Sequence, residues 1–139
     1  MDFENLLGRE EYQIVKDPAI AIEIGESGKV VAGGQTIAGN LIVTVPVALK
    51  ARGIHIQAKW FVPGHDAKVV CEQVIDCGTI PAGKEAFPFS LKLPNGPFSC
   101  DESPDPISWL LKAWIDIPLE ADAETETSFH MIPGPSQGV

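Results

Sequence analysis

Cysteine and histidine are the residue types in this chain best suited to binding a metal or to attacking a substrate. The chain has three of each, at Cys71, Cys77, Cys100, His55, His65 and His130. None of them falls in a CxxC, HxxxH or HxH spacing of the kind that zinc sites use. On an unbroken strand Cys71 and Cys77 would lie roughly 20 Å apart, at about 3.3 Å per residue. We therefore expect no metal and no cofactor, and free thiols in a reducing cytosol.

Nucleophilic catalysis needs a serine or cysteine, a histidine and a carboxylate that converge in space. Cys100 and Asp101 with His130 have the right residue types, but no nucleophile-elbow pattern accompanies them. His65 and Asp66 follow Pro63 and Gly64 in a predicted turn, where aspartate commonly bonds its own backbone. The sequence thus predicts a protein that is not an enzyme, with a metal-dependent hydrolase as an alternative that metal analysis can test.

Two stretches resemble ion-binding motifs without matching them. The glycine-rich segment 33–39 lacks the lysine and hydroxyl of a phosphate-binding loop, and strand residues follow it, so we interpret it as a turn. The acidic residues Glu120, Asp122, Glu124 and Glu126 do not have the spacing of a calcium-binding EF-hand. A solvated acidic edge is the better interpretation of that run.

These side chains would be positioned by strands with one buried face. Apolar residues occupy every second position from 87 to 93, and again at Trp109, Leu111, Ala113, Ile115 and Ile117. A period of two is what a half-buried strand requires. Similar runs at 20–24, 40–47, 54–60, 69–76 and 124–131, with a short one at 13–15, give about eight strands. In the run 40–47, Leu41, Val43, Val45 and Val47 are expected on one buried face.

Leu110 and Trp114 point to the opposite face of the strand over 107–117. An exposed tryptophan beside a leucine on one sheet face predicts a partner-binding surface. Phe61 and Phe98, near loop ends, would extend it. The alternative is that an amino-terminal arm, through Phe3, Leu6 and Leu7, covers this face.

Size and charge restrict the classes of protein. The 139 residues allow one domain, and we expect an arm over 1–12, a β-sandwich over 13–132 and a flexible tail over 133–139. The net charge of −9, with only 10 basic residues, argues against a nucleic-acid partner. No apolar run approaches the ~18–20 residues that span a bilayer. The first residues lack the pattern of a signal peptide, so we expect a cytoplasmic protein without membrane insertion.

Five segments have the order and spacing of a known family of sandwich proteins. They are 32–39, 49–54 (LKARGI), 83–94 (GKEAFPFSLKLP), 97–99 (PFS) and 109–113 (WLLKA). Together they resemble the arrestin-type β-sandwich of arrestins, the arrestin-like retromer subunit and bacterial sporulation-control proteins. Segment 32–39 lacks the proline and glutamate of the family's turn. The paired amino-terminal lysines that sense phosphate in visual arrestins have no counterpart, so no functional residue is carried over.

The resemblance implies an all-β, immunoglobulin-like sandwich of two antiparallel sheets with a non-catalytic scaffold or adaptor role. Our first hypothesis is a protein-interaction module that uses its outer sheet face or an edge strand, and the edge would also permit homo-oligomers. The alternative is a small-molecule or carbohydrate-binding sandwich that uses Trp60, Trp114 or the turn Pro63–Asp66. Neither hypothesis identifies the partner.

Overall fold

The computed structural model describes residues 18–25, 29–101 and 104–134. This part of the chain forms ten strands and no α-helix. The strands are β1 (Ala19–Glu23), β2 (Val30–Ala32), β3 (Thr36–Val45), β4 (Leu49–Lys50), β5 (Gly53–Phe61), β6 (Lys68–Ile75), β7 (Thr79–Ile80), β8 (Gly83–Lys92), β9 (Ser108–Asp116) and β10 (Ala123–Ile132). The expected all-β class is confirmed.

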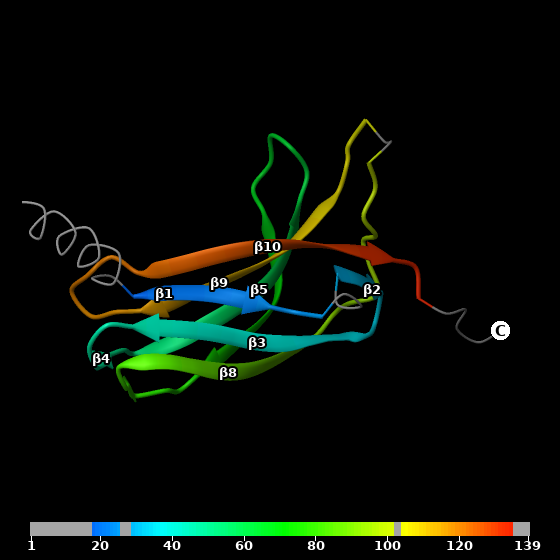
Figure 1. Cartoon of the computed structure of the whole chain (residues 1–139). Helices are drawn as coiled ribbons and strands as arrows, with labels where there is room; N and C mark the ends of the chain where they lie inside the picture. The colour runs from blue at the N-terminus through cyan, green and yellow to red at the C-terminus, as the bar shows by residue number, and fades with distance from the viewer. Residues whose placement is uncertain (1–17, 26–28, 102–103, 135–139) are drawn as a thin grey trace, which may run out of the picture.

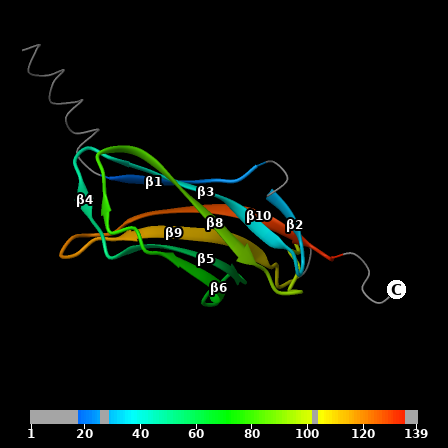
Figure 2. The ribbon, with the colours of Figure 1, turned by 90° about the horizontal axis from the view of Figure 1, so that it is seen from below.

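Two sheets lie face to face as the layers of a sandwich (Figures 1 and 2). One has three strands in the order β1-β3-β8, and the other has five in the order β2-β10-β9-β5-β6. Strands β4 and β7 pair with each other outside both sheets. All pairs are antiparallel except β10 with β2, which is parallel.

The core fills the space between the two layers, and the residues with the predicted alternation supply it. From the five-stranded sheet come the odd positions of β9 and the even positions of β5, such as Leu111 and Ile56. The three-stranded sheet contributes Leu41, Val43 and Phe89. Trp109 is only 1% exposed, and its indole N–H donates to the carbonyl of Pro97 over 2.7 Å. That bond ties the connection between β8 and β9 to the core.

Two local predictions are wrong. The turn expected over 33–39 ends at residue 35, and β3 already begins at Thr36. Gly39 lies within this strand, opposite Phe89, and must be glycine because a Cβ there would collide with the carbonyl oxygen of Glu23 and lie 2.8 Å from the Ile24 side chain. Val47, expected in the core, is 69% exposed. Pro46 has no N–H to continue the ladder beyond Val45, so the chain leaves the sheet there.

The sequence pattern also misses three short strands, β2, β4 and β7. Each has two or three residues, which are too few to show a period. The predicted arm over 1–12 and the strand over 13–15 lie outside the described residues. Of the predicted tail over 133–139, the structure describes only residues 133 and 134.

Candidate functional site on the outer sheet face

The outer face of the five-stranded sheet carries three rows of side chains across β6, β5, β9 and β10. The register of the strands defines each row. The first row is Val74, His55, Trp114 and Glu124. The second is Glu72, Gln57, Lys112 and Glu126, and the third is Val69, Lys59, Leu110 and Ser128. Among the described elements, none lies over this face in Figure 2.

Trp114 lies in the first of these rows and is held flat by its neighbours. Its ring stacks on the His55 imidazole, with centroids 4.8 Å apart and planes 5° from parallel. The His55 Nδ1 is 3.2 Å from a carboxylate oxygen of Glu72. The Lys112 Nζ lies 5.8 Å from the centre of the indole and 3.4 Å from the Glu124 carboxylate. These contacts fix the ring of Trp114 before any partner binds.

The structure places three of the four predicted partner-binding residues on the same sheet face. Leu110 and Trp114 are half-buried on the outer face of β9. Phe61 ends β5 on the same face, opposite Ser108 and therefore diagonal to Leu110. Phe98 lies elsewhere, in the connection between β8 and β9. Its ring is 3.0 Å from the position that a Cβ on Gly33 would take, at the turn after β2.

Sequence reasoning missed several members of this face. The alternation over 54–60 places His55 outward, but its stacking on Trp114 depends on the register between β5 and β9, which no local pattern encodes. The exposed valines of β6 were missed as well. Val69 is 50% exposed and Val74 is 54% exposed. They extend the apolar part of the face to the edge of the sheet.

The two edges on this side of the sandwich differ. At the β8 edge, Pro88 has no N–H, and the N–H of Ser90 donates to the Gln73 side chain over 2.9 Å. Strand β6 has eight residues, and it shows only a bulge, between Ala58 and Lys59 of its partner, as protection. Strand β6 is therefore the more open edge for pairing with another chain.

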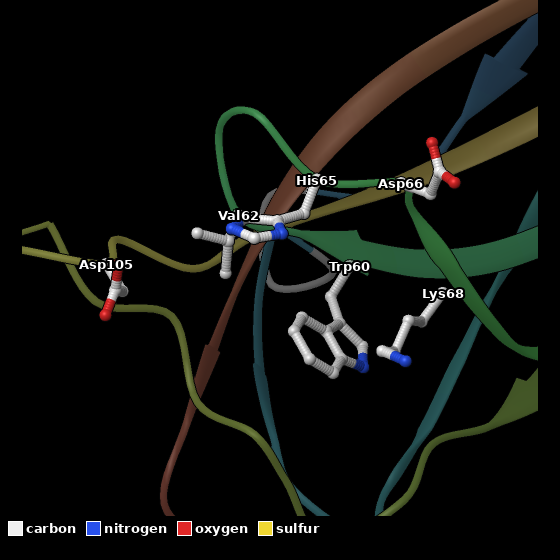
Figure 3. A pocket seen from close by; sticks show the side chains of 6 residues that line it. All are labelled: Trp60, Val62, His65, Asp66, Lys68 and Asp105. Carbon is white, nitrogen blue, oxygen red and sulfur yellow. The ribbon is translucent and has the colours of Figure 1, made fainter.

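A second concave feature lies at the end of the sandwich, away from the outer face. The loop between β5 and β6 and the connection from β8 to β9 project from the same end (Figure 1). Between them is a cavity of about 320 Å³. Its lining residues come from both segments (Figure 3): Trp60, Val62, His65, Asp66, Lys68 and Asp105. This cavity unites two features that the sequence singled out separately, Trp60 and the turn Pro63–Asp66.

All three cysteines are free thiols and half-buried. Burial raises the pKa of Cys71, and a hydrogen bond with the backbone of Ala58 offsets part of the rise. Burial also raises the pKa of Cys77, and the nearby Asp76 carboxylate adds to the effect. A raised pKa keeps a thiol protonated and slows its reactions. Within the described residues, no group of three or more His, Cys, Asp or Glu side chains is arranged to hold a metal ion.

The sequence matches no protein-family model and no curated protein. Among solved structures, the chain is similar to Spo0M, the sporulation control protein from Bacillus subtilis, with a TM-score of 0.68 and 17% identity. The match covers 82% of this chain and 49% of Spo0M, so the chain spans about half the length of that protein. The superoxide reductase (neelaredoxin) from Ignicoccus hospitalis aligns over 82% of this chain and 80% of its own, with 16% identity and a TM-score of 0.43. That second likeness is too weak to carry an argument.

In the described part of the chain, no helix is long and apolar enough to cross a membrane. The likeness to Spo0M confirms the predicted resemblance at the level of the fold. The chain has the arrestin-like fold of the sporulation-control protein.

Proposed function

We propose that this chain is a non-enzymatic regulatory module, an immunoglobulin-like sandwich that binds a protein partner through the outer face of its five-stranded sheet. One observation carries the proposal: Trp114 is fixed flat against His55 on a sheet face that no other described element covers. Tryptophan is the residue type most enriched among side chains that dominate binding energy. A ring already fixed loses little conformational freedom when a partner docks.

The surroundings of Trp114 fit the organisation of a protein interface. Leu110 and Phe61 lie along the same face, and the exposed Val69 and Val74 continue it to the edge of β6. The row of Glu72, Gln57, Lys112 and Glu126 lies between Trp114 and Leu110, and Glu124 lies beside Trp114. The face therefore offers apolar contacts on both sides of a charged row, so that apolar area and charge complementarity both contribute to recognition of a partner.

The charge of the face indicates the chemistry of the partner. Its outward carboxylates are Glu72, Asp116, Glu124 and Glu126, and they outnumber the basic groups beside them, which are Lys59, Lys112 and the Arg52 guanidinium that pairs with Asp116. The whole chain carries a net charge of −9. A partner with basic residues around an apolar contact would be attracted to this face, and its association rate would fall as salt is added.

The open edge of β6 supports a second mode of contact on the same side of the molecule. An extended segment of the partner would pair with the main chain of β6 while its side chains reach Val69 and Val74. In a homo-oligomer, the segment that pairs with β6 would come from a second copy of this chain. This is the self-association predicted from the sequence, although the like charges of the two copies oppose it. Sedimentation analysis separates the two, because only self-association makes the isolated chain dimeric.

The regulatory part of the proposal is supported by the fold of Spo0M, which is described as a sporulation control protein. The cytoplasmic location that we propose is supported by the three free cysteines, since unpaired thiols are typical of reducing compartments. Both remain proposals for this chain.

The test is quantitative affinity purification from the native cell with three forms of the protein: wild type, Trp114→Ser and Val47→Ser. Val47 is a matched control, because it is an exposed apolar residue outside the five-stranded sheet. We expect a partner that wild type and Val47→Ser recover equally and that Trp114→Ser loses at least tenfold, with an unchanged circular dichroism spectrum. Equal recovery by Trp114→Ser would contradict the proposal.

A further inference from the structure

We infer that the cavity at the end of the sandwich is a binding site for an uncharged carbohydrate, whose ring stacks on Trp60. The inference is independent of the proposed function. Trp60 lies on the inner side of β5, with the parity of the buried Ile56 and Ala58, whereas Trp114 lies on the outer face of β9. The two tryptophans therefore belong to separate surfaces.

The size and position of the cavity suit a small ligand. Its volume of about 320 Å³ lies at the lower end of the about 300–1,000 Å³ typical of small-molecule sites. Two segments distant in sequence form it, the loop after β5 and the end of the β8–β9 connection at Asp105. Loops carried by a rigid sandwich are a common place for binding sites. A mono- or disaccharide is the class of ligand that fits this space.

The apolar wall of the cavity consists of Trp60 and Val62. The Trp60 indole is half-buried and packs partly against the core, so its position is fixed from behind. A flat aromatic ring that lines a cavity matches the C–H face of a sugar ring, which is the apolar side of an otherwise polar molecule.

The polar rim excludes other classes of ligand. His65, Asp66, Lys68 and Asp105 also line the cavity. In Figure 3 the Lys68 side chain extends toward the indole, Asp105 lies on the other segment beyond Val62 and His65, and the Asp66 carboxylate points away. Because an ammonium group and carboxylates share this rim, it gives a charged ligand of either sign little net attraction. A purely apolar ligand would offer no hydrogen bond to the Lys68 ammonium or the His65 imidazole.

Sugar hydroxyls both donate and accept hydrogen bonds, so they can pair with the Lys68 ammonium, the Asp105 carboxylate and the His65 imidazole. The turn that carries His65 is already formed. The His65 N–H donates to the carbonyl of Val62 over 3.0 Å, and Gly64 has a φ of 86° after Pro63. This is the pattern of a type II turn, whose rigid residues reduce the entropy lost on binding.

The experiment follows the indole N–H signals of the full chain by ¹⁵N NMR during titration with defined probes. The chain has three tryptophans, and they report on three places: Trp60 on the cavity, Trp109 on the core and Trp114 on the outer face. The probes are maltose, cellobiose, lactose and chitobiose, with sodium phosphate and tetramethylammonium as charged controls. We expect at least one disaccharide to move the Trp60 signal saturably, while the Trp109 and Trp114 signals stay fixed.

Variants of the exposed rim test the contacts without disturbing the core. His65→Ala and Lys68→Met should each weaken binding of that disaccharide about three- to tenfold, because each removes one hydrogen-bonding side chain. Trp114→Ser should bind it like wild type, so failure of the outer-face proposal leaves this result unaffected. The inference is overturned if no disaccharide moves the Trp60 signal, if a charged control moves it saturably, or if both rim variants bind as wild type does.

Discussion

Trp109 and Trp114 lie five residues apart on β9 and occupy opposite faces of the same sheet. Trp109 is fully buried between the two sheets and donates its N–H to Pro97. Trp114 is half-buried, and its neighbours are a histidine, a lysine and a glutamate on the surface. The same residue type thus holds the fold together on one face and, in our proposal, contacts a partner on the other. An odd spacing along a strand is sufficient to separate the two roles.

The neighbours of each ring explain the difference. On the inner face the second sheet supplies the partners, so that tryptophan is part of the core. On the outer face the contacts to Trp114 come from side chains of the same sheet, and part of the ring remains accessible. Each prediction below compares the two faces.

The largest expected effect is on the stability of Trp109→Ala. Loss of this buried ring should lower the free energy of unfolding by about 3–5 kcal/mol, because it leaves a cavity between the sheets. The same change at Trp114 should cost only about 1–2 kcal/mol, since that ring is half-buried and loses mainly its stacking partner. Urea unfolding measures both values. Equal losses would show that the outer face is covered in the isolated chain.

Leu111 and Leu110 provide the same comparison with adjacent residues. Leu111 is fully buried and Leu110 is half-buried on the other face. We expect Leu111→Ala to cost about 2–4 kcal/mol and Leu110→Ala less than about 1 kcal/mol. Thermal unfolding followed by circular dichroism is sufficient to rank them. The reverse ranking would mean that the strand faces the other way.

A smaller effect concerns the contact that fixes Trp114. A double-mutant cycle with His55→Ala and Trp114→Ala should give a coupling of about 0.5–1.5 kcal/mol, as expected for a stacked aromatic pair. Glu72→Gln serves as a control that keeps the stack and weakens only the hydrogen bond to His55. Additive single effects would show that the stack does not hold the ring.

The smallest effect is on thiol chemistry. Cys71 pairs with the buried Ala58 on the inner side of β6, and burial raises its pKa. The thiolate fraction of Cys71 therefore begins to rise only at a higher pH than that of a free cysteine. We expect Cys71 to react with iodoacetamide at least several times more slowly than a cysteine introduced as Ser128→Cys, on the outer face of β10. Peptide mapping by mass spectrometry gives both rates. Equal rates at neutral pH would contradict the placement of Cys71 on the inner side of β6.

The sequence predicted much of the scaffold and only part of the candidate site. The alternation over 107–117 correctly assigns Trp109 to the core and Trp114 to the other face, because side chains of a strand alternate whatever lies around it. The end of β3 was misjudged at Val47, since apolarity alone does not show that Pro46 ends the ladder. The stack of His55 on Trp114 and the cavity shared by Trp60 and Asp105 join distant segments, so only the paired strands reveal them.

The most direct test of the outer-face proposal is site-specific photo-cross-linking in the native cell. A benzoylphenylalanine residue would replace Leu110, on the outer face, or Val47, outside the five-stranded sheet. The account predicts a covalent adduct with one protein from position 110, and no such adduct from position 47. No adduct from position 110, or the same adduct from both positions, would contradict it.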